Sequence, residues 1–224
     1  MRGAITAPKM KKEPRQLALY ARFLDFKPRK GDLRKLEILE AAIQCLSSDG
    51  IHHTTFESVG KQLGIGRAHV AYHFPELGDL IEAAIKFCVS HVQALTVDAV
   101  SAEDSDQEKL EAFINATFEW VQRYPQQASA ILLLYYLASI DRRYKKLHDE
   151  VRTLGAKRIQ ALLEGCLGRK HKAKSELLAR RVQAIMTGNI VEFLTTQPKE
   201  SLEHLRRRTI SEVTELCDLL LSKS

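Results

Sequence analysis

The segment LGIGRAHVAYHF, residues 63–74, contains several side chains whose types and spacing could do chemistry. His69 and His73 are four residues apart, which would place both imidazoles on one face of a helix, where they could bind a metal ion. Gly64 and Gly66 resemble the start of a phosphate-binding loop. A third interpretation is that the segment recognises another molecule through its outward-facing polar side chains.

The sequence lacks residues that a metal site or a phosphate-binding loop would need. The glycine pattern lacks a third glycine and follows a helical pattern, whereas a dinucleotide loop follows a strand. Two histidines alone leave a metal under-coordinated, and no carboxylate or cysteine stands at a helpful local spacing. The chain also has no nucleophile elbow and no H-E-x-x-H sequence. We therefore expect no metal site, no cofactor and no enzyme activity.

The charge is unevenly distributed along the chain. The net charge is +6, but residues 1–35 hold 11 Lys/Arg and 3 Asp/Glu, which leaves residues 36–224 with a net charge of −2. A basic arm on a nearly neutral body adds affinity for polyanions such as nucleic acids, because each neutralised phosphate releases counterions. A solvated tail is the simpler alternative.

The cysteines and the apolar runs indicate a cytoplasmic protein. Four cysteines, Cys45, Cys88, Cys166 and Cys217, are scattered singly and are typical of small buried hydrophobic residues. The longest strongly apolar run, residues 130–138, is much shorter than the roughly 20 residues that span a bilayer. No apolar segment with a cleavage site follows the basic N-terminus, so we expect neither a secretory signal nor a membrane partner.

The apolar residues recur at helical spacing without strand alternation, which predicts an all-α fold. Thr54 is predicted to cap a short helix that ends at Leu63, with Glu57 bonding back to it in a capping box. A further short helix is predicted within the arm, near residues 17–24. The remaining helices are expected at about residues 32–48, 67–73, 75–101, 104–124, 126–139, 141–167, 174–196 and 201–222.

Two short helices joined by a glycine-bearing turn are typical of a helix-turn-helix, whose second helix enters the major groove of DNA. On that helix Arg67 could bind a guanine or a phosphate, His69 could reach a base edge, and Tyr72 could donate to a phosphate. His73 either joins this face or packs at the end of the helix. This third interpretation of the segment accounts for most of its polar side chains.

The residues ILEAAIQCLSSDGIHHTTFESVGKQLGIGRAHVAYHF resemble the DNA-binding domain of the TetR family of transcriptional regulators. They follow the family's pattern of an Ile-Leu-x-Ala-Ala helix, a glycine, a Thr-Thr cap, the two-helix reader and a closing His-Phe. The resemblance implies a basic arm (1–31), a three-helix helix-turn-helix domain (32–77) and a six-helix effector-binding and dimerisation domain (78–224).

Three positions depart from the family's pattern. The family usually has Ser or Thr where Gly66 stands, a phosphate-contacting Tyr where Ala71 stands, and Lys where Leu77 stands. Tyr72 is one position later than that Tyr, about 100° around a helix, so it need not replace it.

Other residues are predicted to supply the phosphate contacts. Lys30, Arg34 and Lys35 stand at the head of the first helix, and the arm before them could add minor-groove or backbone contacts. Thr55 is a further candidate for a phosphate contact at a helix N-terminus, with simple capping as the alternative.

The resemblance also implies a small-molecule effector and a homodimer. The candidate effector residues combine apolar bulk with a polar handle, although each one taken alone is more often ordinary core than a ligand contact: Phe113, Trp120, Tyr135, Tyr136, Met186, Asn189 and Phe193. They favour a hydrophobic or flat ligand. Apolar stripes on the last two helices fit a four-helix interface between two copies, or packing within one chain.

The sequence thus predicts a ligand-responsive repressor that binds a palindromic site on double-stranded DNA as a homodimer. The alternative is a helical interaction protein of the same fold, in which DNA binding is weak or lost.

Overall fold

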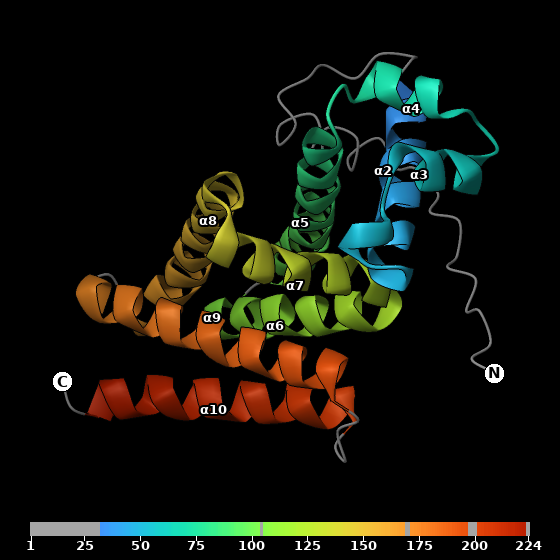
Figure 1. The fold of residues 1–224 in the computed structure, drawn as a ribbon. Helices are drawn as coiled ribbons and strands as arrows, with labels where there is room; N and C mark the ends of the chain where they lie inside the picture. Colours follow the sequence, from blue (N-terminus) through green and yellow to red (C-terminus); the bar gives the residue numbers. More distant parts are fainter. Residues whose placement is uncertain (1–31, 104, 169–170, 197–200, 223–224) are drawn as a thin grey trace. The chain divides into compact units, whose positions relative to one another are not determined.

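The computed structural model describes residues 32–103, 105–168, 171–196 and 201–222, and all regular structure within them is helical (Figure 1). The all-α prediction is therefore confirmed. Lys30 and the predicted arm helix lie outside the described residues. The helices are α2 (Asp32–Ser48), the 3-10 helix η1 (Ile51–His53), α3 (Phe56–Leu63), α4 (Arg67–His73), α5 (Leu77–Ser101), α6 (Asp106–Arg123), α7 (Pro125–Ile140), α8 (Arg142–Leu167), α9 (Lys172–Thr195) and α10 (Leu202–Ser222).

The described chain forms two compact units, which divide within α5 between Ala94 and Leu95. In the first unit α2 packs on α3, and α3 packs on α4. The buried face of α2 includes Leu36, Leu39, Ile43 and Leu46, which recur at helical spacing. Gly50, which lies between α2 and η1, has a φ of 78°, a positive value that glycine adopts without strain.

The cap of α3 differs from the prediction. Thr55, not Thr54, is the N-cap: its Oγ1 accepts from the Ser58 amide at 3.0 Å, and the Thr55 amide donates to Ser58 Oγ at 2.8 Å. Thr54 is buried and its hydroxyl donates to the Gly50 carbonyl at 2.9 Å. The predicted box on Thr54 and Glu57 is wrong because η1, which the sequence did not indicate, uses Thr54 to close its own turn.

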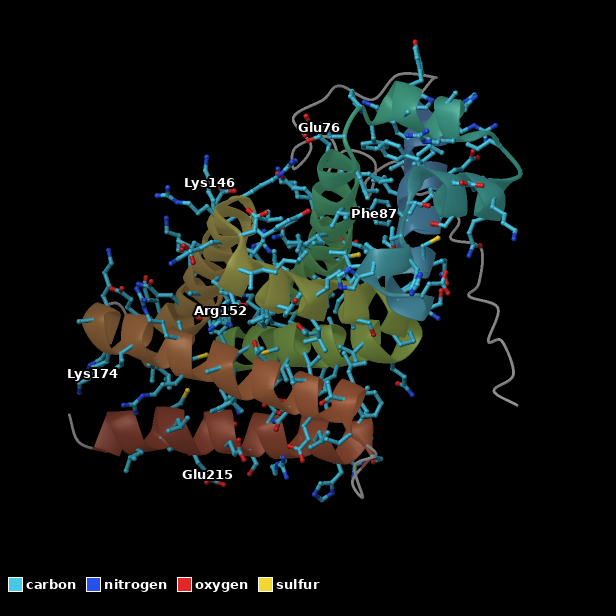
Figure 2. All side chains as sticks on the ribbon, viewed as in Figure 1. Glu76, Phe87, Lys146, Arg152, Lys174 and Glu215 are labelled. Atoms are coloured by element: carbon cyan, nitrogen blue, oxygen red, sulfur yellow. The ribbon has the colours of Figure 1, made fainter. Side chains whose placement is uncertain are left out.

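The second unit is a bundle in which α8 packs on α6, α7 and α9, while α10 packs on α6 and α9. α6 begins with a capping box between Ser105 and Glu108, and Asp141 caps α8 by accepting from the Arg143 amide at 2.8 Å. α9 and α10 run side by side in opposite directions (Figure 1). Figure 2 shows Arg152 of α8 on the side of α9, where its Nη1 donates to Thr187 Oγ1 at 3.2 Å.

α5 is the one described helix whose length and composition would allow it to cross a membrane. Of its most apolar window, 72% is buried inside the protein, and buried core helices of soluble proteins often meet this criterion.

Candidate functional site

The turn between α3 and α4 is fixed by two glycines with different roles. Gly64 adopts the left-handed conformation, with φ of 67°, and ends α3. Gly60 lies one turn earlier in α3 and is buried; its carbonyl accepts from the Ile65 amide at 2.9 Å. An ideal Cβ on Gly60 would lie 2.6 Å from the Ile65 carbonyl oxygen, so the backbone of the turn occupies the space of a side chain. The sequence prediction included Gly64 but missed Gly60.

α4 exposes nearly all of its polar side chains. Val70 is its one buried residue, and Phe74, which follows the helix, is also buried. Arg67 and His69 are exposed, and Tyr72 is 83% exposed. Two apolar anchors thus hold α4 on the first unit and leave a hydrogen-bonding surface outside, as a reading helix requires.

His73 is half-buried among rings on the same helix. Its ring centroid is 5.6 Å from that of His69, and the Tyr72 ring meets it edge-on at 5.2 Å. Among the described residues, no group of three or more His, Cys, Asp or Glu side chains could hold a metal ion. His69 lies on the exposed face of α4, and His73 lies beside it, half-buried.

The residues predicted to bind phosphate already have protein partners. Arg34 Nη1 lies 2.9 Å from Glu37 Oε2, with both side chains 41% exposed. Lys35 Nζ lies 5.9 Å from the centre of the Phe74 ring, which joins the start of α2 to the end of α4. Thr55 caps α3. Arg34 and Lys35 are still partly exposed, so a phosphate could compete for either cation.

The three departures from the family's pattern lie around α4. Gly66 is the N-cap of α4 and supplies no side-chain cap; an added Cβ there would meet nothing within 4 Å. Ala71 and Leu77 are half-buried. A larger residue would therefore fit at position 66. Because glycine has no side-chain hydroxyl, the first amides of α4 have no side-chain acceptor at the N-cap.

Residues 38–84 match the family model of the bacterial regulatory proteins, tetR family. The chain carries a TetR-family helix-turn-helix domain. The match spans α2, η1, α3, α4 and the start of α5, and this family is one of transcriptional regulators.

A curated relative agrees with this TetR assignment. The HTH-type transcriptional regulator BetI of Burkholderia thailandensis is 24% identical over 92 residues, 41% of this chain. The alignment covers 47% of that regulator, so the chain matches about half the length of this relative.

Solved structures share the fold over most of the chain. A protein from Pseudomonas aeruginosa PAO1 classed as a transcriptional regulator superposes with a TM-score of 0.73 at 19% identity, covering 90% of this chain and 95% of its own. One from Saccharomonospora viridis, solved in complex with choline, has a TM-score of 0.73 at 19% identity, with 83% and 97% covered. Within the described residues, three α-helices precede α5 and six run from α5 to α10, in agreement with the predicted TetR-like fold.

The predicted effector residues occupy several different environments. Trp120 is buried, and its indole donates to Gln127 Oε1 at 3.1 Å. Asn189 of α9 is buried; its amide nitrogen donates to Thr209 Oγ1 of α10 at 2.8 Å, so its polar atoms serve the contact between these helices. Met186 is buried one turn before Asn189, Phe113 and Phe193 are half-buried, and Tyr136 is 55% exposed.

Tyr135 has a polar neighbour that the sequence did not indicate. Its ring meets that of His148 of α8 edge-on, with the centroids 4.8 Å apart. Nε2 of His148 is buried and has no hydrogen-bond partner among the described residues. No sequence pattern marks His148, because the pairing joins α7 to α8 through tertiary packing. The seven predicted residues lie on α6, α7 and α9, which pack on one another.

Proposed function

We propose that the chain is a ligand-responsive transcriptional repressor that binds a palindromic operator as a homodimer. The observation that supports this most is the exposed face of α4, with Arg67, His69 and the 83% exposed Tyr72 on a helix anchored by Val70. These donors suit the edges of bases and the phosphates that border the major groove.

Each exposed residue has a distinct proposed role. Arg67 forms paired hydrogen bonds with a guanine or binds a phosphate, because its guanidinium presents a rigid fork of donors. His69 reaches a base edge and Tyr72 donates to a phosphate. Because the arm and the start of α2 carry a net charge of +8 over residues 1–35, Lys30, Arg34 and Lys35 add phosphate contacts that compensate for Gly66 and Ala71.

The second unit is proposed to sense the effector and to form the dimer. A relative of the same fold has been crystallised with choline, which supports a small-molecule ligand for this unit as well. Binding of an effector within this unit would favour one arrangement of two reading helices over another. Leu177 of α9 is 56% exposed, and an added Cβ on Gly188 would meet nothing within 4 Å, which suits close approach by a second copy.

Electrophoretic mobility shift on DNA from the region upstream of the protein's own gene tests this proposal. The protein is first shown to be dimeric by light scattering, and binding is measured at low and at moderate salt. We expect a discrete shifted band that an excess of unlabelled random DNA does not abolish. No shift at low salt with dimeric protein would contradict the proposed function.

A helical interaction protein of the same fold is the second candidate function. It is favoured by the bare N-cap at Gly66 and by Ala71 and Leu77, which cannot make the phosphate contacts usual at those positions. Retained dimerisation without DNA binding in the same mobility-shift experiment would support this candidate.

A further inference from the structure

A groove of about 470 Å³ lies in the second unit between the start of α6, the end of α8 and the C-terminal half of α10. Its floor is apolar: Leu110 and Ile114 come from α6 and Val213 from α10, and all three are buried. None of the predicted effector residues is among its described lining residues. The groove is large enough for a small organic molecule, and its floor would remove an apolar group from water.

The charged residues that line the groove all have the same sign. Asp106 and Glu111 come from α6 and Asp218 from α10, and no Lys, Arg or His is among the described lining residues. Lys109 pairs with Asp106 at 3.3 Å, and Gln107 donates to Glu111 at 3.3 Å. Asp218 is exposed and makes no hydrogen bond or ion pair with the described residues. The groove therefore combines an apolar floor with negative charge that its own lining does not neutralise.

Asp106 is also held in place by α8. An ideal Cβ on Gly165 would lie 2.6 Å from Asp106 Cγ, so the absence of a side chain there lets this carboxylate approach α8. The Cys166 thiol donates to the Asp106 carbonyl oxygen at 3.2 Å. A ligand that contacts Asp106 would thus act at the contact between α6 and α8.

We propose that this groove binds the effector, and that the effector is an organic cation with an apolar body, such as an alkylammonium. The cationic head is attracted by the carboxylates of Asp106, Glu111 and Asp218, while the apolar body covers Leu110 and Ile114. An anion of the same shape is repelled, and a neutral molecule gains only the apolar contact. The assignment of this ligand as an effector rests on the proposed function, whereas its binding to the groove does not.

Titration calorimetry of the full chain with hexyltrimethylammonium tests the binding, with hexanesulfonate as the anion of similar length. We expect the cation to bind at least about fivefold more tightly than the anion, with affinity that falls as salt rises. Equal binding of the two probes, or no binding of the cation, would overturn the proposal.

The thiols of the groove report where the probe binds. Cys166, which is half-buried, and Cys217, which is buried, line the groove. Cys45 and Cys88 are buried elsewhere, so reaction at these two thiols would report opening of the fold. Alkylation by a maleimide, followed by mass spectrometry of the peptides, should show slower reaction at Cys166 and Cys217 when the cation is present. Binding without this protection would place the cation outside the groove and would contradict the site.

Variants that remove carboxylate charges test whether the groove carboxylates, rather than the negative surface in general, hold the cation. Asp218→Asn combined with Glu111→Gln should weaken cation binding by about fivefold, because two of the three groove carboxylates lose their charge. Glu215→Gln combined with Glu212→Gln is the matched control, because it also removes two carboxylates and neither lines the groove. Glu215 lies on the outer edge of α10 (Figure 2) and accepts from Ser211 Oγ at 3.1 Å, and Glu212 lies 3.8 Å from Arg208 Nε. An equal effect of the control variant would overturn the role of the groove carboxylates.

The same samples separate this inference from the proposed function. Cation binding to a protein that shifts no DNA would contradict the proposed function and leave the groove site supported. A DNA shift in a protein that binds no cation would contradict the groove site alone. If the cation binds in the groove but leaves the DNA affinity unchanged, the effector role is overturned.

Discussion

The backbone at Ile65 lies where the side chain of any residue other than glycine would stand at Gly60. The distance from an ideal Gly60 Cβ to the Ile65 carbonyl oxygen is 2.6 Å, and the obstacle is backbone rather than a flexible side chain. The Gly60 carbonyl also accepts a hydrogen bond from the Ile65 amide at 2.9 Å, and this bond holds the turn against α3. The relative position of α3 and α4 therefore depends on Gly60.

Gly60→Ala should destabilise the first unit by about 1–3 kcal/mol, the usual cost of inserting a methyl group where the structure cannot yield. Unfolding in urea, followed by circular dichroism, measures the free energy of unfolding. Gly66→Ala is the matched control, because a Cβ at Gly66 meets nothing within 4 Å and its φ is −72°. Equal stability of Gly60→Ala and the wild-type protein would show that the turn can move away.

Gly66→Ser should stabilise α4 by about a few tenths of a kcal/mol and bind DNA several-fold more tightly. A serine at the N-cap accepts from the first amides of α4, and its hydroxyl can also donate to a phosphate. Because a hydroxyl is neutral, the dependence of DNA binding on salt should stay the same. Titrations at several salt concentrations measure both quantities, and Gly66→Ala, which adds no hydroxyl, should not improve binding.

The sequence was sufficient to predict the described α-helices, because each carries its signal in neighbouring residues, but it did not indicate the 3-10 helix η1. The buried stripe of α2 and the end of α8 at Gly168 follow from periodicity and from a C-terminal glycine. The shift of the cap from Thr54 to Thr55 was not predictable by pattern, since either threonine fits a capping box and the choice depends on η1. The need for glycine at position 60 was missed because it arises from the backbone of Ile65, five residues later in the sequence, which the turn folds back against α3.

In the candidate sites too, the exposure of side chains was predictable from local sequence, whereas their tertiary partners were not. The exposure of Arg67, His69 and Tyr72 agrees with the reading face that helical spacing predicted, although their roles toward DNA are still predictions. The partner of Asn189 on α10 and the ring contact of Tyr135 with His148 arise from tertiary packing. Helical periodicity indicates which residues turn inward, but it does not indicate which helix they meet.

His69→Ala should change the sequence preference of DNA binding more than Lys30→Ala does. His69 is exposed on α4, where a side chain that meets a base edge affects some sequences and not others, by about 1–3 kcal/mol. Lys30 is proposed to contact phosphate, so its removal should weaken binding to all sequences alike. Affinities for a selected site and for random DNA measure the difference, and an equal loss on both for His69→Ala would show that His69 reads no base.

Thr209→Val should destabilise the contact between α9 and α10 by about 1–3 kcal/mol, because the buried amide of Asn189 then loses its hydrogen-bond partner. Thr209 Oγ1 also donates to the Leu205 carbonyl at 2.8 Å, which fixes the hydroxyl as an acceptor for Asn189. A double-mutant cycle with Asn189→Leu, read by urea unfolding, isolates the pair, since the double variant removes both polar groups. Strictly additive effects would indicate that the two side chains are not coupled.

Glu203 should make the stability of the second unit depend on pH in the acid range. The hydrogen bonds from Arg206 Nη2 at 2.6 Å and from Arg207 Nε at 2.7 Å lower the pKa of Glu203 to about 2. A pKa depressed on folding contributes stability above the ordinary value of 4.5, and this stability is lost as the pH falls toward 2. Arg206 also bonds Asn115 of α6, so protonation of Glu203 should loosen the start of α10 on that helix.

Glu203→Gln should therefore flatten the loss of stability between about pH 5 and pH 2, while lowering stability at pH 7 only slightly, because the carboxylate is exposed. Urea unfolding at a series of pH values measures the difference between the variant and the wild-type protein. Glu212→Gln is the control, since Glu212 lies 3.8 Å from Arg208 Nε and makes a longer contact. If the Glu203→Gln and wild-type curves stay parallel down to pH 2, the arginine pair does not act on Glu203 in solution.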